Sequence, residues 1–413
     1  MSRFSFIHAA DLHLGSPFQA LAVKDAAIAD RFAQAIRIAF TRLVDEAIAR
    51  KVAFVVIAGD VYDGEWKDNA IGLFFNREVA RLAQAAIPVV FLRGNHDADS
   101  VVTKSVPLPR SVHQFPTGKA ATIRLDEVSV ALHGRGFAER ASGENLAAAY
   151  PAPVPGAFNI GVLHTSLNGR PPHDVYAPCS IDDLRSRGYD YWALGHVHEF
   201  EIVGEDPHIV FPGNLQGRSI RETGAKGAVL VHVDDGRVTG TERLILDEAR
   251  WLRLTVDISS EAGPGTIPGA VAKAFESHAE AARDRLIALR IELVGTCGFS
   301  RRLSALRQSL ADDIQAECHH LHSDAWLEKL VIDVLPAREA ASVPAVDASI
   351  DLEALLAAVM ADEMVLGETH EVIASITTRL PGGIGAGENP LGDPQSLLRD
   401  ARDLLLAKTA IGG

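Results

Sequence analysis

The sequence predicts an α+β fold in which two β-sheets pack face to face and helices flank them. Apolar runs at 3–9, 52–58 and 87–92 alternate with amphipathic helical stretches at 26–50 and 68–85. This β-α-β rhythm is typical of a parallel sheet. The chain beyond the last of these runs is dominated by short strands, which predicts a second sheet. Polar side chains of the kind that bind metals follow the strands rather than interrupting them.

The individual elements follow from their periodicity. Apolar residues such as Ile28, Phe32 and Ile36 recur every three to four positions, which predicts a helix with one buried face. The run 52–58 is apolar and β-branched, as suits a strand that is buried on both faces. Further strands are expected at 121–125, 128–133, 158–163, 190–194, 208–211, 228–233 and 238–246.

The pattern restarts near residue 250, which predicts a first domain at 1–250 followed by a smaller module. Strands and helices alternate again in a β-α-β-α-β order, and we expect an α/β cap domain at 251–336. A linker leads to a helical region at 345–413, interrupted by a Gly/Pro-rich connector at 381–393. The expected elements are strands at 251–258, 286–294 and 326–333 and helices at 267–282, 301–317, 349–379 and 394–408.

Composition excludes several classes of protein. The chain has 40 Lys+Arg against 54 Asp+Glu and is 47% hydrophobic, which excludes a disordered chain. No apolar run approaches the roughly 20 residues of a membrane helix, so no membrane association is expected. Three Cys without a CxxC pair exclude a disulfide scaffold or a zinc ribbon. Because the N-terminus enters a strand pattern with no signal-peptide region, we expect a cytoplasmic protein.

Side chains with oxygen and imidazole donors follow five of the expected strands. In α/β proteins the carboxyl ends of parallel strands meet at one edge of the sheet, where ligands bind. A single His in such a place is commonly a capping or surface residue, but five such coincidences argue for a shared site. The candidates are Asp11, His13, Asp60, Asn95, His164, His196 and His198.

The donor set predicts which metals would bind. Carboxylate, amide and imidazole groups without a thiolate suit Mn²⁺, Fe²⁺ or Zn²⁺ and are rich in nitrogen for Mg²⁺ alone. Seven candidates exceed what one ion uses. Two ions about 3.5–4 Å apart, bridged by one carboxylate, account for the number and are a standard device for phosphate-ester hydrolysis. Asp60 is the natural bridge because it is the sole carboxylate in its turn.

The five motifs together resemble those of the calcineurin-like metallophosphoesterases. They are Asp11-x-His13, Gly59-Asp60, Gly94-Asn95-His96-Asp97, Gly161-x-x-His164 and Gly195-His196-x-His198. The Asp11-Leu12-His13-Leu14-Gly15 form, the cap and the C-terminal helices are similar to SbcD-type DNA repair exonucleases of the bacterial SbcD-like branch. For residues 1–250 this resemblance implies a four-layer α/β/β/α sandwich, two divalent ions (Mn²⁺ first, with Fe²⁺, Zn²⁺ or Mg²⁺ as alternatives) and hydrolysis of phosphodiester bonds by a bridging hydroxide.

The resemblance also implies residue roles. One metal would be held by Asp11, His13, Asp60 and His198, and the other by Asp60, Asn95, His164 and His196. His96 matches the residue that contacts the scissile phosphate and protonates the leaving oxygen. Asp97 is expected to orient His96.

Two further residues have alternative interpretations. Asp63 stands where SbcD-type nucleases often carry a second His, so it either faces the substrate and redirects activity or caps the following helix. Asn214, in a short motif after a late strand, either faces the substrate or is present because Asn tolerates a left-handed turn. The structural interpretation is favoured for Asn214.

The substrate is predicted less directly than the chemistry. Dispersed basic residues could line a surface for a nucleic-acid backbone or could simply be solvated; they are Arg77, Arg81, Arg93, Lys104, Arg110, Arg135, Arg170, Arg218 and Arg221. DNA as substrate, an SbcC-type SMC-like ATPase docked on the C-terminal helices and a possible homodimer are implied by the resemblance, with a role in DNA repair. Alternatives are a phosphoesterase for a small nucleotide-type phosphodiester and a non-catalytic scaffold of the same fold.

Overall fold

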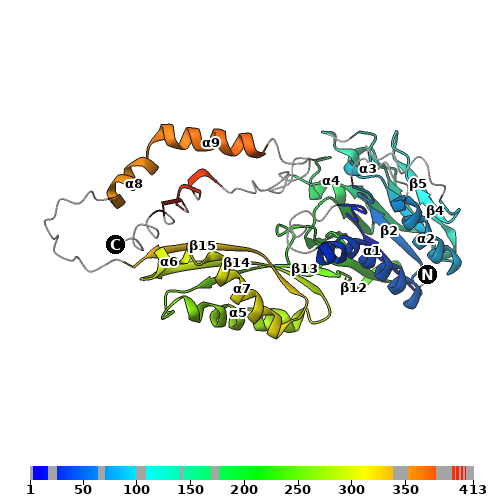
Figure 1. The fold of residues 1–413 in the computed structure, drawn as a ribbon. Helices are drawn as coiled ribbons and strands as arrows, with labels where there is room; N and C mark the ends of the chain where they lie inside the picture. The colour runs from blue at the N-terminus through cyan, green and yellow to red at the C-terminus, as the bar shows by residue number, and fades with distance from the viewer. Residues whose placement is uncertain are drawn as a thin grey trace. The chain divides into compact units, whose positions relative to one another are not determined.

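The computed structural model describes most of the chain and divides it into two compact units (Figure 1). Of the described residues, the first unit comprises those within 3–16, 26–251 and 284–286, and the second those within 252–283 and 287–405. Among the described residues no helix is both long and apolar enough to cross a membrane. The described residues are 3–16, 26–63, 70–98, 108–139, 143–168, 176–337, 352–377, 393–395, 397–399, 401, 402 and 405.

The first unit contains two six-stranded sheets. The first sheet has the order β12-β11-β1-β2-β3-β4, and β1 to β4 run parallel while β11 is antiparallel to β1 and β12. The strand β4 was not expected from the sequence. The strands are β1 (Phe4–Ala9), β2 (Phe54–Ala58), β3 (Val89–Leu92), β4 (Val112–Gln114), β11 (Gly227–Asp234) and β12 (Arg237–Ile245).

The second sheet has the order β5-β6-β7-β8-β10-β9, in which the four central strands are parallel. The edge strands β5 and β9 are antiparallel to their neighbours. The sequence did not predict β9, whose Glu and Gly residues and half-exposed pattern fit an edge strand. The strands are β5 (Ala121–Leu125), β6 (Val130–Gly134), β7 (Phe158–His164), β8 (Tyr191–Gly195), β9 (Phe200–Glu205) and β10 (His208–Pro212).

The two sheets share an apolar core, and helices cover their outer faces. Phe6 stacks on Phe54 at 4.8 Å and meets Tyr191 of the second sheet edge-on at 5.3 Å. On the outer side of the first sheet, Phe75 of a helix contacts Phe91 of β3 at 6.3 Å. The predicted α+β sandwich is confirmed. The helices are α1 (Ala26–Ala49), α2 (Ala70–Gln84), α3 (Asn95–Ala98) and α4 (Ile181–Arg185), with short 3₁₀ turns at Asp126–Val128 and Leu146–Ala149.

The second unit contains a three-stranded sheet of order β13-β14-β15 whose apolar face packs against α5 and α7. Its core is made of aliphatic side chains such as Leu289, Ile291 and Ile314, and Cys318 is buried among them. In Figure 1, α5 and α7 lie on the same side of this sheet. The elements are β13 (Ala249–Asp257), α5 (Ile267–Ala281), β14 (Leu286–Cys297), α6 (Ser300–Leu303), α7 (Arg307–Leu321) and β15 (Ala325–Pro336), with a 3₁₀ turn at Pro264–Thr266.

Two long helices expected in this unit are interrupted. The stretch predicted at 301–317 is divided into α6 and α7. The stretch predicted at 349–379 forms α8 (Leu352–Met360) and α9 (Glu363–Thr377), because the Asp362 carboxylate accepts the backbone N–H of Met364 and begins a new helix. The predicted linker after residue 337 and the connector at 381–392 lie outside the described residues, as does much of the helix expected at 394–408.

Candidate metal centre

The carboxyl ends of β1, β2 and β3 meet those of β7 and β8 at one rim of the first unit. Ion pairs and hydrogen bonds across this rim join residues far apart in the sequence, such as His13 to His198 and His164 to Asn95. The structure thus brings together the polar side chains that the sequence placed after separate strands. Asp11, His13, Asp60 and His164 are buried.

The backbone at this rim is strained. Asp11, His13, Asp60 and His196 have φ values of 51°, 45°, 52° and 94°. Non-glycine residues seldom adopt this left-handed region, and each instance costs on the order of 1–3 kcal/mol. Four such residues lie together at this rim. The surrounding structure must therefore hold their backbone in a conformation that is unfavourable by itself.

The motif glycines are required for close approach between the strand ends. A Cβ on Gly59, whose φ is +98°, would lie 2.4 Å from His164 Nδ1. A Cβ on Gly94 would lie 2.2 Å from Asp60 Oδ1. Side chains at either position would displace the polar groups that the strands converge to place.

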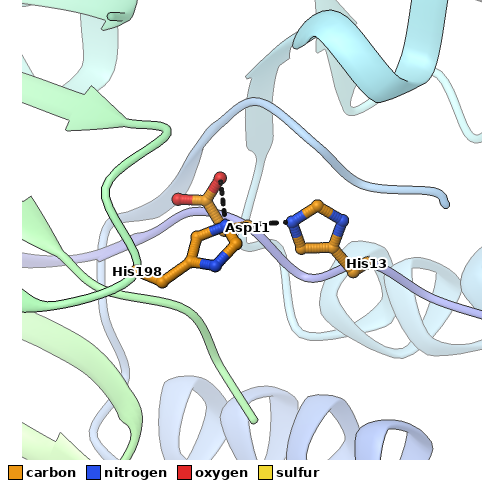
Figure 2. A group of neighbouring side chains, drawn as sticks. All are labelled: Asp11, His13 and His198. Atoms are coloured by element: carbon orange, nitrogen blue, oxygen red, sulfur yellow. Dashed lines mark hydrogen bonds and ion pairs between the residues drawn. The ribbon is translucent and has the colours of Figure 1, made fainter. Parts of the chain in front are cut away.

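One side of the rim, which we call the His198 side, consists of Asp11, His13 and His198 (Figure 2). The Nε2 atoms of His13 and His198 lie 3.2 Å apart. Asp11 Oδ1 is 3.8 Å from His198 Nε2, and Asp60 Oδ2 is 3.8 Å from His13 Nε2. These four side chains could share one metal ion.

The other side, the His164 side, is built around the His164 ring. Its Nε2 lies 2.9 Å from Asn95 Oδ1 and 3.4 Å from Asp60 Oδ2, so Asp60 stands between the two sides. The His196 ring lies 5.2 Å from the His164 ring, and the His196 backbone N–H donates to the Asp11 carboxylate. A second group of potential ligands thus adjoins the first.

Hydrogen bonds to the outer ring nitrogens show that these groups suit a cation. His164 Nδ1 lies 2.9 Å from the Ala58 carbonyl, which can only accept, so the proton is on Nδ1. His164 Nε2 faces the oxygens of Asn95 and Asp60. Burial alone would lower the pKa of His164, but Asp60 raises it to about 9, so without a metal ion this nitrogen carries a proton. A divalent cation bound by Nε2 and these oxygens would take the place of that proton, and the fixed Nδ1–H is typical of metal-binding His.

The buried carboxylates indicate the same need for positive charge. Burial raises the pKa of Asp11, an effect that His164 and His198 only partly offset. Burial would also raise the pKa of Asp60, but His164 and His13 hold it below its usual range. The carboxylates of Asp11 and Asp60 are buried within 4.8 Å of each other, and such a pair is costly in free energy without a compensating cation. The donor set therefore fits divalent metal ions.

His96 lies beside this group and is paired with Asp63. Its Nδ1 is 2.9 Å from Asp63 Oδ1, its backbone N–H donates to Asp60, and its side chain is 31% exposed. Burial alone would lower the pKa of His96, but the hydrogen bond to Asp63 raises it. The Asp63 carboxylate therefore supports a protonated His96; residues 64–69, where a helix capped by Asp63 would begin, lie outside the described residues.

The expectation that Asp97 orients His96 is wrong. The Asp97 carboxylate accepts the backbone N–H groups of Val61, Tyr62 and Gly94 at 3.1, 2.8 and 2.9 Å. It thereby caps α3 at its third position and ties the turn after β2 to the turn after β3. Adjacent residues of a helix do not face each other, so the Asp97 carboxylate does not orient the His96 ring.

Sequence reasoning missed Glu222. Its Oε1 lies 2.8 Å from His198 Nδ1, and its carboxylate also accepts from Asn214 Nδ2 and the Arg218 backbone N–H. Burial would raise the pKa of Glu222, but Arg218 and His198 hold it well below its usual range. The Arg218-x-x-x-Glu222 spacing was the available signal, and Arg218 was predicted only as one of several dispersed cations.

Asn214 makes structural hydrogen bonds inside the fold. It is buried, its Nδ2 donates to Glu222 Oε2 and to the Gln216 carbonyl, and its backbone is bridged to Ala10. The left-handed residue of this turn is Gly213, with a φ of 77°, and not Asn214. Asn214 therefore supports the Glu222–His198 contact.

Comparison with known proteins agrees with this site. Residues 4–200 match the model of the family described as calcineurin-like phosphoesterase. In this match, its sandwich fold and its gathered donors, the first unit is similar to the calcineurin-like phosphoesterases, a likeness that implies divalent metal ions. Residues 251–335, in the second unit, match the middle domain of metallophosphoesterase YhaO.

Individual relatives are similar over part of their length. The uncharacterized metallophosphoesterase YhaO of Bacillus subtilis is 34% identical over 263 residues, which cover 63% of this chain and 64% of that protein. The DNA double-strand break repair protein Mre11 of Sulfurisphaera tokodaii is 25% identical, covering 63% of this chain and 67% of that one. A subunit of the nuclease SbcCD of Escherichia coli K12 is 24% identical, covering 58% and 67%. The chain thus spans just under two thirds of YhaO.

Proposed function

We propose that this chain is a metal-dependent DNA nuclease that hydrolyses phosphodiester bonds with two divalent ions, Mn²⁺ by preference. The observation that carries the proposal is the position of His164 Nε2, which lies 2.9 Å from Asn95 Oδ1 and 3.4 Å from Asp60 Oδ2 while Ala58 fixes the ring. A cation is the simplest partner for such a group.

Different residues of the chain would bind the metal ions and donate the proton. Asp11, His13, Asp60 and His198 would hold one ion, and Asp60, Asn95, His164 and His196 the other. Such ions, when bound, supply a nucleophile at neutral pH and stabilise the charge that develops on the phosphate. His96 protonates the leaving oxygen from Nε2, because Asp63 holds Nδ1 at 2.9 Å and stabilises the charged ring.

The relatives support DNA as substrate. Proteins named as Mre11 and as part of the nuclease SbcCD are similar to this chain over more than half of its length, at low identity. We propose on this ground that an SbcC-type ATPase is a partner in DNA repair. A variant lacking 381–413 should lose that ATPase in a co-purification assay and still cleave a small diester; retained ATPase would exclude docking through this region.

A small nucleotide-type phosphodiester is the second candidate substrate. The chain carries a net charge of −14, and Arg218 beside the site is already paired with Asp63 and Glu222. Neither feature favours indiscriminate binding of a nucleic-acid backbone. The similarity to YhaO, a protein named as uncharacterized, leaves room for this alternative.

One experiment separates these substrates. End-labelled linear double-stranded DNA and bis-p-nitrophenyl phosphate are incubated with the protein and Mn²⁺, and again with chelator. DNA cleavage that requires Mn²⁺ and is absent in Asp60→Asn supports the nuclease. Cleavage of the small diester alone supports the second candidate. No cleavage of either substrate at full metal occupancy would contradict both.

A further inference from the structure

The side chain of Arg218 lies between two carboxylates at the candidate metal centre. Its Nη1 is 3.2 Å from Asp63 Oδ2, and its Nη2 is 2.9 Å from Glu222 Oε1. The Arg218 backbone N–H also donates to Glu222 Oε2 at 2.7 Å. The side chains of Arg218, Asp63 and Glu222 are 18%, 20% and 11% exposed.

Each of these carboxylates holds one imidazole. Asp63 Oδ1 lies 2.9 Å from His96 Nδ1, and Glu222 Oε1 lies 2.8 Å from His198 Nδ1. The contacts therefore form an unbroken sequence of His96, Asp63, Arg218, Glu222 and His198.

We propose that Arg218 is a positioning residue that fixes His96 relative to His198 by clamping Asp63 and Glu222. The inference rests on the proposed function, because His96 and His198 matter only if the site hydrolyses a phosphoester. It assigns Arg218 no contact with the substrate. The guanidinium Nε, Nη1 and Nη2 all face carboxylate oxygens, and its charge is shared between two anions.

The chemistry of the side chain explains why arginine is required. A planar guanidinium presents several donors in fixed directions, so one group can hold two carboxylates at once. A lysine ammonium is a point charge on a flexible stem and cannot fix both directions. Without Arg218, the Asp63 carboxylate, which is paired with His96 and lies 3.9 Å from His13 Nδ1, would lose the guanidinium that fixes its direction.

The loop that carries Arg218 is itself held in place. Gln216 Oε1 accepts the backbone N–H groups of Glu248 and Ala249, and Trp251 Nε1 donates to the Gly217 carbonyl. Asn214 Nδ2 donates to Glu222. The clamp is therefore preorganised by hydrogen bonds on both sides of Arg218.

The test combines kinetics with a measurement that needs no activity. Arg218→Gln, Arg218→Lys and the control Arg221→Gln, an exposed arginine of the same loop, are made in the wild type and in His96→Ala. Turnover of bis-p-nitrophenyl phosphate at saturating Mn²⁺ is measured, with melting temperatures. Long-range ¹H–¹⁵N spectra record the His96 and His198 rings.

We expect Arg218→Gln to lower kcat about 10–100-fold, as loss of an outer partner typically does, with KM nearly unchanged. Arg218→Lys should restore only a small part of the lost kcat, and Arg221→Gln should leave kcat unchanged. In His96→Ala, Arg218→Gln should lower the residual rate less than about twofold, because neighbours that act through one group are not additive.

Two results would overturn the clamp. One is an equal loss of kcat from Arg218→Gln with and without His96; the other is unchanged His96 ring resonances in both Arg218 variants. If Arg218→Gln does not fold, the Lys variant carries the same comparisons. An inactive wild type with shifted His96 and His198 resonances in the variants would refute the proposed function and leave the clamp standing.

Discussion

The two sides of the candidate metal centre are held by different means. On the His198 side, the outer ring nitrogen of His198 contacts the Glu222 carboxylate, which is in turn paired with Arg218. On the His164 side, the outer ring nitrogen of His164 contacts the Ala58 carbonyl of β2. A charged side-chain network orients one ligand candidate, and the neutral backbone orients the other.

The difference shows that the strand ends at one rim can hold two groups of potential ligands by different means. The Ala58 carbonyl is fixed by the strand itself, so the His164 side depends on close packing of backbone. The Glu222 carboxylate orients the His198 imidazole through a side chain, so the His198 side depends on residues that single substitutions remove. The His164 side should therefore be sensitive to glycine substitutions, and the His198 side to changes of charge.

Asp60 is common to both sides, so its loss should have the largest effect. Asp60→Asn keeps the shape of the side chain but removes a charge that lies 3.4 Å from His164 Nε2 and 3.8 Å from His13 Nε2. We expect hydrolysis of bis-p-nitrophenyl phosphate to fall below detection and bound Mn²⁺ to be lost, measured by elemental analysis. Full metal content in this variant would refute a shared carboxylate.

Gly59→Ala should break the His164 side through the backbone. The new Cβ would lie 2.4 Å from His164 Nδ1 at a φ of +98°, so the ring must leave the Ala58 carbonyl. We expect loss of one bound metal ion and nearly all activity. Gly156→Ala is the matched control, with a φ of +77° and no atom within 4 Å of the new Cβ. It should cost only about 1–2 kcal/mol of stability.

His96→Ala should separate chemistry from metal binding. Removing a general acid typically costs about 10²–10⁴-fold in rate. We expect kcat to fall by this order while bound Mn²⁺ per chain is unchanged, because His96 is not assigned to either ion. Loss of metal would instead make His96 a ligand, as its place in the group of His13, Asp60 and His96 would allow.

Glu222→Gln should weaken the His198 side alone. The amide can keep the shape and one hydrogen bond but leaves Arg218 with less compensating charge. Affinity for one Mn²⁺ ion should drop about 10–100-fold, measured by calorimetric titration, while the other ion binds as before. Glu205→Gln, at an exposed position of β9, should change neither. Equal weakening of both ions would remove the distinction between the sides.

The smallest effect on turnover is expected in the second unit. Arg290 and Glu328 form a bidentate pair at 2.8 Å there, with side chains only 9% and 7% exposed. Breaking such a pair leaves a buried charge and costs about 3–5 kcal/mol. Glu328→Gln should lower the stability of this unit in denaturant unfolding, without changing hydrolysis of the small diester by more than about twofold, the scatter expected for independent sites.

The strand ends of the site could be predicted because apolar runs and polar endings alternate visibly in the sequence. Asp11, Asp60 and His164 are each the kind of residue that a parallel sheet brings to one edge. Glu222 and Arg218 could not be predicted in this way, because they lie on a loop whose partners are fixed only by tertiary hydrogen bonds.

Other predictions from the sequence were wrong for local reasons. Proximity in sequence suggested Asp97 as the partner of His96, but the helical turn points Asp97 at backbone N–H groups, and Asp63 from another strand end takes that place. The edge strands β4 and β9 carry weak apolar patterns. The break between α8 and α9 depends on one capping carboxylate, that of Asp362, inside a helical pattern.

The most direct test of a two-ion phosphodiesterase is a Mn²⁺ titration of chelator-stripped protein, with bound metal and hydrolysis of bis-p-nitrophenyl phosphate followed together. We predict two ions per chain, with hydrolysis rising as the second ion binds and absent in Asp60→Asn. One ion at saturation, or two ions without hydrolysis of the diester, would contradict the assignment.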